Sequence, residues 1–239
     1  MNTQKRIVRI VSILFVMVCF SMISFAQKTT ANYDNAGKVI PFSGFKNTDI
    51  GAATKTGTAT INTDELKIVA GGSDIWGKHD GFHFSYKLIK GDFDMSVQVL
   101  SLSAANLYTK AGIMARTNMS DSCQHVLFQV FPNNSSRNKN NGGCEFQYRT
   151  ENGGEMKAIY PDPKIKGNQC EVAFPKTWIR LKRQGDVFES YFSNDNKNWK
   201  LYSTFSLKIP LELMVGLAVT AHDSNAYTTA RFGSVRLKK

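Results

Sequence analysis

Two short segments alternate apolar residues with small or polar ones, and this alternation constrains the fold more than any other feature. They are residues 110–116 and 216–222. Successive side chains of an extended chain point to opposite faces. The apolar faces hold Ala111, Ile113 and Ala115 in the first segment and Leu217, Val219 and Ala221 in the second. Each apolar face requires a core, whereas the opposite face suits a surface that receives a polar ligand.

Similar short runs fill the chain from about residue 44 onward. The alternating runs 82–88 and 93–99 flank the turn-forming sequence Lys90-Gly91-Asp92 and predict a β-hairpin. Gln184-Gly185-Asp186 predicts a second turn of this kind. Further strands are expected at 58–61, 66–70, 123–131, 143–150, 178–182, 187–192, 199–205, 214–222 and 228–237. Many short strands without a capped window of helical period predict an all-β sandwich.

The first 26 residues have the pattern of a secretory signal peptide. Three basic residues precede position 10, an apolar run covers 10–23, and Ser24-Phe25-Ala26 places small residues before a cleavage point at Gln27. The protein is therefore expected in the periplasm or outside the cell. A membrane anchor is the first alternative, but the apolar run is shorter than the roughly 20 residues that a spanning helix needs. A lipoprotein acylated at Cys19 is the second, and the bulky Val18 before it argues against this.

The remaining chain is expected to form one domain. Residues 27–43 are polar and irregular and predict a flexible lead-in, and residues 44–239 are enough for one sandwich with a full core. The formal net charge of the chain is +11, but its lysines and arginines are scattered. Scattered charge favours a solvated surface over a nucleic-acid site. Weak attraction to anionic glycans stays open.

Three cysteines follow the predicted signal peptide, and export permits a disulfide between two of them. If 123–131 and 143–150 are adjacent antiparallel strands, Cys123 lies at the end far from their connecting loop. Cys144 lies near that loop, so the distance is too great for a bridge between them. Cys144 with Cys170 is the favoured pair, and three buried free thiols are the alternative.

Catalytic and metal motifs are weak in this sequence. A glycosidase needs two carboxyl groups that flank the sugar bond, and no strand carries Glu-x-Asp-x-x-Glu or a close relative. A non-catalytic domain is therefore favoured, and no cofactor is implied. The asparagine-rich turns are similar to those of calcium-binding lectins, whose sites gather carboxylate and carbonyl oxygens. The candidate ligands of a structural calcium ion are Asp74, Asp80 and Asp223.

The polar faces of the strands form the candidate binding surface. If the strands share one sheet, their polar side chains converge, and planar amides, guanidinium groups and imidazoles can bind hydroxyl- or carboxylate-bearing sugars. The residues are Lys110, Arg116, His125, Gln129, Glu145, Gln147, Arg149, Thr220 and His222. Trp76, in a polar loop, could stack on a sugar ring or pack against the sandwich edge. The alternative is an ordinary solvated face cross-linked by ion pairs such as Glu145 with Arg149.

Six motifs occur in the order seen in one family. They are Asp74-Ile-Trp76, Asp80-Gly-Phe82-His-Phe84, Gly91-Asp92-Phe93, Lys110-Ala-Gly-Ile-Met-Ala-Arg116, Gly216-Leu-Ala-Val-Thr-Ala-His222 and Phe232. Together they resemble the DUF1349-type, concanavalin A-like lectin/glucanase domains, akin to the module at the C-terminus of some β-xylosidases. The likeness covers residues 44–239. It implies a jelly-roll sandwich of two antiparallel sheets and an association with carbohydrate-active bacterial proteins, and it supplies no catalytic set.

The sequence therefore predicts an exported, lectin-like domain that binds a polysaccharide or other glycan on the concave face of one sheet, without turnover. Two alternatives stay open. A glycoside hydrolase, or an accessory domain of polysaccharide degradation, is the first; the insert at 160–170 and the lack of an attached hydrolase domain argue against a role beside a fused enzyme. A structural or adhesion protein of the cell envelope is the second. Neither nucleic acid nor a membrane span after signal removal is expected.

Overall fold

The computed structural model describes residues 37–51, 55–137, 142–160 and 170–239. The predicted signal peptide, residues 1–26, and most of the lead-in lie outside these ranges. Within them, the regular elements are strands, apart from one 3₁₀ turn, η1 (Phe42–Gly44). The predicted all-β class is confirmed. None of the described segments forms a helix long and apolar enough to cross a membrane.

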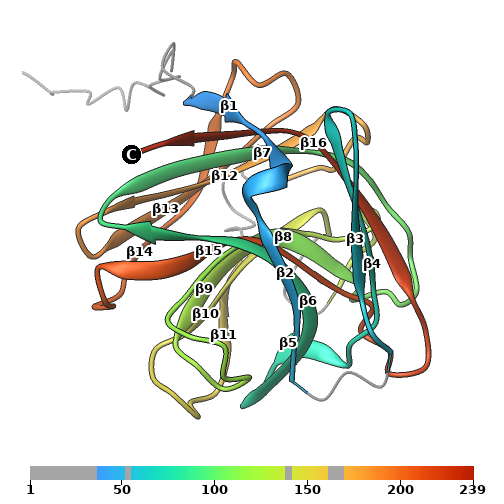
Figure 1. Cartoon of the computed structure of the whole chain (residues 1–239), viewed down its shortest axis with the longest axis horizontal. Coiled ribbons are helices and arrows are strands. Elements are labelled where there is room, and N and C mark those ends of the chain that lie inside the picture. Colours follow the sequence, from blue (N-terminus) through green and yellow to red (C-terminus); the bar gives the residue numbers. More distant parts are fainter. Residues whose placement is uncertain (1–36, 52–54, 138–141, 161–169) are drawn as a thin grey trace, which may run out of the picture.

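The strands form two antiparallel sheets that lie in two layers (Figure 1). Sheet 1 has the order β14 (Lys200–Ser206), β13 (Val187–Ser193), β12 (Thr177–Gln184), β7 (Phe93–Leu102), β16 (Thr228–Lys238), β4 (Glu65–Ala70), β3 (Thr58–Asn62), with β1 (Lys38–Ile40) also paired to β16. Sheet 2 has the order β11 (Lys157–Ile159), β10 (Cys144–Arg149), β9 (His125–Val130), β8 (Lys110–Arg116), β15 (Glu212–Thr220), β6 (His79–Lys90), β2 (Lys46–Ile50), with β5 (Asp74–Trp76) paired to β6. This arrangement is the predicted sandwich.

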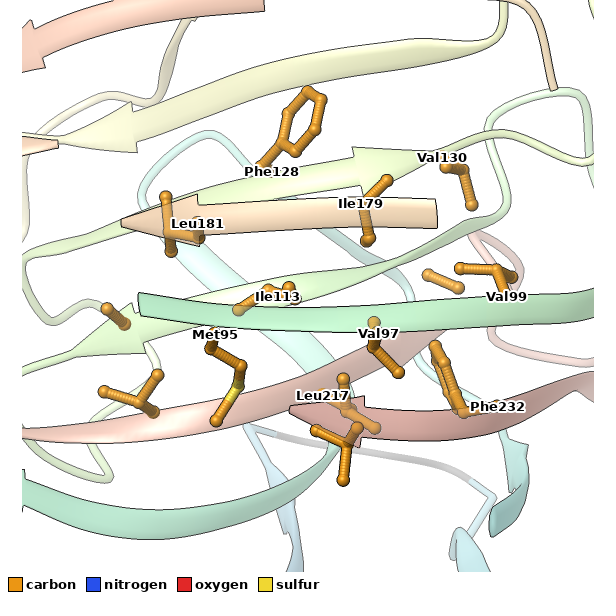
Figure 2. Packing of buried hydrophobic residues seen from close by; sticks show 14 of the residues in the cluster. Met95, Val97, Val99, Ile113, Phe128, Val130, Ile179, Leu181, Leu217 and Phe232 are labelled. Atoms are coloured by element: carbon orange, nitrogen blue, oxygen red, sulfur yellow. The ribbon is translucent and has the colours of Figure 1, made fainter. Parts of the chain in front are cut away.

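The apolar faces of the two sheets meet in one main core. Figure 2 shows side chains of both layers in it, among them Val97 of β7, Ile179 of β12, Ile113 of β8 and Leu217 of β15. Each of these four is fully buried. Burying a side chain of this size contributes roughly 1.5–3 kcal/mol relative to leaving it exposed. The strand alternation therefore assigned the inward faces of 110–116 and 216–222 correctly.

The expected hairpin between 82–88 and 93–99 is wrong. β6 belongs to sheet 2 and pairs with β15, whereas β7 belongs to sheet 1 and pairs with β12 and β16. The turn at Gly91 carries the chain from one layer to the other, and its backbone N–H donates to Leu211 O (2.9 Å). Alternation identifies the faces of a strand but not its neighbours. The turn at Gly185, by contrast, joins the paired strands β12 and β13 as expected.

The sandwich begins earlier than the expected boundary at Gly44. β1 pairs with β16 from Lys38 to Ile40, and Phe42 lies in the main core with 4% of its surface exposed. Part of the sequence expected as lead-in is therefore an edge strand followed by an anchoring aromatic side chain. The sequence of 27–43 did not predict this strand, because three residues are too few to show an alternating pattern of apolar and polar side chains.

A disulfide links β10 of sheet 2 to the connection that leads into β12 of sheet 1. Cys144 at the start of β10 is bonded to Cys170, and their Cα atoms are 5.4 Å apart. Cys123 is a free, buried thiol. This is the pairing that the order of the strands favoured. Because Cys144 lies beside Glu145, the bond fixes the β10 strand where the polar face of sheet 2 begins.

A hairpin made of β5 and the start of β6 covers part of the outer face of sheet 2, the face turned away from sheet 1. Trp76 pairs with His79 at its tip, and Asp74 pairs with Gly81 at its base. Ile75 joins a second apolar cluster with residues of the sheet below it. The buried members of this cluster are Ile50, Ile75, Phe82, Phe84, Met114, Leu127, Met156 and Ala218.

Candidate functional site

The predicted binding residues share the outer face of sheet 2. The register places Arg149 of β10 beside His125 of β9, and His125 beside Arg116 of β8. Four residues further along the strands, Glu145 lies beside Gln129 at the other end of β10. Backbone pairing alone therefore aligns the polar side chains in rows across the sheet. The hairpin then divides these rows into a covered part and an open part.

Arg149 lies in the covered part and holds the hairpin in place. Its Nη1 and Nη2 donate to Asp80 Oδ2 (2.9 Å) and Oδ1 (2.8 Å), and both side chains are fully buried. Nη2 also donates to Gly77 O (3.0 Å), at the hairpin tip, and Nε to Gly154 O (2.9 Å). This side chain cannot reach a ligand, so its role is structural. The expected ion pair of Glu145 with Arg149 is replaced by Asp80 with Arg149.

Arg116 and His125 belong to the same buried cluster. Arg116 Nε and Nη2 donate to the sulfur of Cys123 at 3.2 and 3.0 Å, and the His125 side chain has no exposed surface. Burial alone would raise the pKa of the Cys123 thiol, but hydrogen bonding from His125 and the charge of Arg116 lower this pKa to about 6. The guanidinium group of Arg116 also lies 5.1 Å from the centre of the Phe82 ring. Neither residue faces open solvent.

The open part of the face is a pocket of about 320 Å³. Its walls come from the hairpin, from β8 and β10, and from loops at the ends of the strands. The lining residues are Asp74, Trp76, Tyr108, Lys110, Phe131, Arg137, Glu145, Gln147, Tyr160 and His222. Five of the ten predicted ligand-binding residues are in this set: Trp76, Lys110, Glu145, Gln147 and His222.

One wall of the pocket holds an aspartate between two basic side chains. Lys110 forms an ion pair with Asp74, and its Nζ also donates to Ile75 O (3.2 Å). His222 Nδ1 lies 3.0 Å from Asp74 Oδ1. Burial would raise the pKa of Asp74, but the charge of Lys110 and the hydrogen bond with His222 hold this pKa below its usual value. Asp74 is therefore ionised and acts as a fixed acceptor.

His222 is placed by an unusual backbone conformation. Its φ is 56°, in the left-handed region that few residues other than glycine adopt. Its ring lies 5.4 Å from the ring of Tyr108, centre to centre. Strained backbone of this kind clusters at functional sites. The conformation turns the end of the segment 216–222 toward the pocket instead of continuing the strand.

The opposite wall is formed by β10. Gln147 Nε2 donates to Glu145 Oε1, and both residues are more than nine-tenths buried. Burial and then the charge of Glu145 raise the pKa of Tyr160 above its usual value, and they raise that of Tyr202 as well. The wall thus presents one carboxylate with an amide and a phenol beside it. Such groups both donate and accept hydrogen bonds.

Trp76 forms the rim of the pocket. It is 40% exposed, and Lys110 Nζ lies 5.7 Å from the centre of its ring. Of the two fates expected for this side chain, its exposure and its place in the pocket lining fit stacking on a ring. An indole face beside a polar floor is an arrangement that can stack on a ring with one apolar side.

Comparison with known families places this geometry in context. The chain matches, over residues 54–239, the family described as "Protein of unknown function (DUF1349)". The chain belongs to this family. The expected resemblance is thereby confirmed. No curated protein matches the sequence.

Solved structures share the fold of this DUF1349 chain at low sequence identity. A functionally unknown protein from Saccharomyces cerevisiae has a TM-score of 0.60 at 16% identity, covering 83% of this chain and 98% of its own. The carbohydrate binding module CBM66 from Bacillus subtilis has a TM-score of 0.51 at 17% identity, covering 82% and 96%. The xylan beta-1,4-xylosidase from Bacillus halodurans C-125 has a TM-score of 0.50 at 12% identity, covering 76% of this chain and 38% of that one. At these identities the likeness shows the fold alone.

The remaining predicted residues of the DUF1349 domain do not line the pocket. Gln129 has no exposed surface, and neither of its amide atoms has a hydrogen-bond partner within the described part of the chain. The Thr220 hydroxyl donates to Gly81 O (2.9 Å) and so ties β15 to the hairpin base. Both side chains are on the predicted face, but both are covered.

Five pocket residues were not predicted as ligand-binding, and one of them, Asp74, was considered only as a calcium ligand. Phe131 continues the outward alternation of β9 by one residue, so the pattern could have found it. Tyr108 and Tyr160 lie in connections, and Tyr160 begins the predicted insert. Arg137 comes from the asparagine-rich loop, where its Nη2 donates to Leu107 O (2.7 Å) and its guanidinium group lies 4.1 Å from the centre of the Phe131 ring. No local pattern in the sequence indicated Arg137.

The aspartates considered for calcium have other roles. Asp74 is paired with Lys110, and Asp80 with Arg149. Asp223 accepts a hydrogen bond from the backbone N–H of Asn225 (2.8 Å), as in a turn. Across the described ranges, no three His, Cys, Asp or Glu side chains form a group that could hold a metal ion. Asp74 and Asp80 are thus each committed to a cationic side chain, whereas Asp223 is not.

Proposed function

We propose that this DUF1349 domain is an exported carbohydrate-binding protein that holds a sugar in the pocket beneath Trp76 and does not turn it over. The observation that carries the proposal is that the exposed indole of Trp76 and the buried polar side chains of Glu145 and Gln147 line the same pocket. Sugar rings present both an apolar face and hydroxyl groups, so they need stacking and directional hydrogen bonds together.

The polar groups of the pocket suit hydroxyl groups. Asp74 and Glu145 offer carboxylate oxygens, which form stronger hydrogen bonds than neutral acceptors do. Gln147 and Tyr160 add an amide and a phenol, and His222 adds an imidazole. Because these groups come from four separate segments of the chain, they surround a bound ring instead of meeting only one edge of it.

The fold supports the same proposal. One structural neighbour is named a carbohydrate binding module. Ligand pockets in proteins are concave, largely apolar and provided with a few fixed polar groups, and the pocket of this domain matches that description. The predicted signal sequence would bring the domain to the polysaccharides outside the cytoplasm.

Glycoside hydrolysis is the second candidate, because Asp74 and Glu145 line the same pocket. A glycosidase requires one carboxylic acid that is protonated and can transfer its proton to the leaving group. Lys110 and His222 hold the pKa of Asp74 low, so Asp74 is a poor proton donor. Hydrolysis would therefore require Asp74 as the nucleophile and Glu145 as the acid, and the product analysis described below distinguishes it from binding alone.

A glycan array tests the proposal. The wild type should bind a set of glycans, and Trp76→Ala and Glu145→Gln should each lose that binding by about tenfold or more, equivalent to about 1.4 kcal/mol. Trp178→Ala is a matched control, because this tryptophan lies on β12 of the other sheet. It should bind as the wild type does. Absence of binding to every glycan, or equal binding by all four proteins, would overturn the proposal.

The same glycans separate binding from hydrolysis. Each bound glycan is incubated with the wild type, and the mixture is analysed for shortened products. An unchanged glycan is the expected result. Products that form with the wild type but not with Glu145→Gln would establish the hydrolase instead.

A further inference from the structure

The pocket is closed on the side of the β5–β6 hairpin. At the hairpin base, Asp74 and Ile75 O are both bound by Lys110 of β8. At its tip, Gly77 O accepts hydrogen bonds from Arg149 of β10 (3.0 Å) and from the backbone N–H of Met156 (3.0 Å). The hairpin therefore lies across the strands of sheet 2 and is fastened at both ends. A glycan chain cannot pass through it.

The floor next to the hairpin is closed as well. Ile75, Met114 and Leu127 pack against one another in the second apolar cluster, and each is fully buried. Opening a continuous groove across the sheet would expose this cluster and break the ion pair of Arg149 with Asp80. Uncovering a buried ion pair and apolar side chains costs several kcal/mol. The pocket is therefore blind and not a section of a longer groove.

The volume of the pocket favours a single sugar unit. Its 320 Å³ is at the lower end of the range of about 300–1,000 Å³ for ligand pockets. A blind pocket of this size can receive the end of a chain, with the following units directed to solvent. An internal unit would need two exits, and the hairpin removes one of them.

The charges of the pocket favour an uncharged unit. Lys110 is paired with Asp74, and Arg137 donates to Leu107 O (3.0 and 2.7 Å) and to Ser135 O (2.8 Å). Both cations are thus engaged by protein oxygens. A sugar carboxylate or sulfate placed here would meet the ionised Asp74, and it would have to displace the hydrogen bonds of each cation.

We infer that the pocket recognises the uncharged terminal unit of a glycan chain and not an internal segment. This inference rests on the proposed function and specifies its ligand class. It narrows the expectation of a glycan bound on the concave face of one sheet. The number of protein molecules bound to one glycan chain then equals the number of suitable ends and does not depend on chain length.

Titration calorimetry on length series tests the inference. The probes are linear gluco-, xylo-, manno-, galacto- and fructo-oligosaccharides, each from disaccharide to octasaccharide, with oligogalacturonides as the acidic series. For a neutral series that binds, one protein should bind per chain at every length. The affinity per mole of chain should change by less than about threefold from the tetrasaccharide to the octasaccharide. Trp76→Ala should lose binding at all lengths, and Trp178→Ala should keep it.

Each other outcome is informative. Affinity that rises about tenfold or more with length, or several protein molecules on one octasaccharide, would overturn recognition of the chain end while leaving carbohydrate binding intact. A preference for oligogalacturonides over every neutral series would overturn the uncharged ligand. Failure of all series to bind would reject the proposed function, and this inference with it.

Discussion

Arg149 of β10 and Asp80 of β6 form a two-point ion pair, 2.9 and 2.8 Å long, in which neither side chain has exposed surface. The two residues are 69 positions apart in the sequence. Their contact fastens the β5–β6 hairpin over the outer face of sheet 2. It thereby decides which of the polar side chains on this face stay open to a ligand.

Arg149→Ala should strongly destabilise the protein. Removing one partner of a buried pair leaves the other charge unpaired, which typically costs about 3–5 kcal/mol. Urea unfolding measures the loss. Arg231→Ala is the control, because Arg231 forms an ion pair with Glu65 on an exposed part of sheet 1, and such pairs contribute little. Equal effects of the two substitutions would show that the Asp80 pair does not hold the hairpin.

Reduction of the disulfide should lower the melting temperature. The bond joins residues 26 positions apart, and closing a loop of this length stabilises a protein by about 3 kcal/mol. For a domain of this size the loss corresponds to a fall of about 6–12 °C. Thermal unfolding with and without dithiothreitol measures it. Cys144→Ser with Cys170→Ser should show the low value in both conditions. A wild-type melting temperature that ignores the reductant would contradict the pairing.

Stability should depend on pH through Cys123. The thiol pKa is about 6 in the folded protein and about 8.5 in an unfolded chain. Because the thiol pKa is lower in the folded protein, ionisation of Cys123 stabilises the folded state. This contribution is complete at a pH above the unfolded-state pKa of about 8.5, and it disappears as the pH falls through about 6. The charged groups facing this sulfur are Arg116 and His125, with the Asp80–Arg149 pair behind them.

Cys123→Ser isolates this contribution. The difference in unfolding free energy between wild type and variant should be greatest near pH 9 and should shrink by up to about 3–4 kcal/mol on going to pH 5. Ultraviolet absorbance of the thiolate should titrate with a midpoint near pH 6. A midpoint near 8.5, with a free-energy difference that does not vary with pH, would show that the thiol is not ionised by Arg116.

The sequence was most informative about faces and least informative about neighbours. Alternation gave the bounds of β8 and the outward direction of Lys110, Glu145 and Gln147. It could not show that β6 and β7 belong to different sheets, because a strand partner depends on contacts distant in the sequence. The short strands β1, β2, β5 and β11 were missed for a related reason. Too few residues alternate in them to give a pattern.

For the candidate site too, the sequence predicted the faces of the strands but not the contacts between distant segments. The alternation of the strands predicted which residues point to the outer face of sheet 2. Which of these residues the β5–β6 hairpin covers depends on the ion pair between Asp80 and Arg149. Arg116, His125 and Arg149 were therefore expected as ligand-binding groups although the structure buries them. Arg137 and Tyr160 enter the pocket from irregular connections, which have no period to interpret. A polar face predicts where a ligand could bind, but only tertiary contacts decide how much of that face remains available.

Gln129→Leu should stabilise the protein. Within the described residues, the two amide atoms of Gln129 are buried without a hydrogen-bond partner, and such a group costs about 1–3 kcal/mol. Leucine is similar in size and needs no partner, so the free energy of unfolding in urea should rise by about 1 kcal/mol or more. Gln147→Leu is the matched comparison, because Gln147 Nε2 is bonded to Glu145. This variant should not gain stability, and it should lose sugar binding. A loss of stability in Gln129→Leu would mean that its amide is hydrogen-bonded in solution.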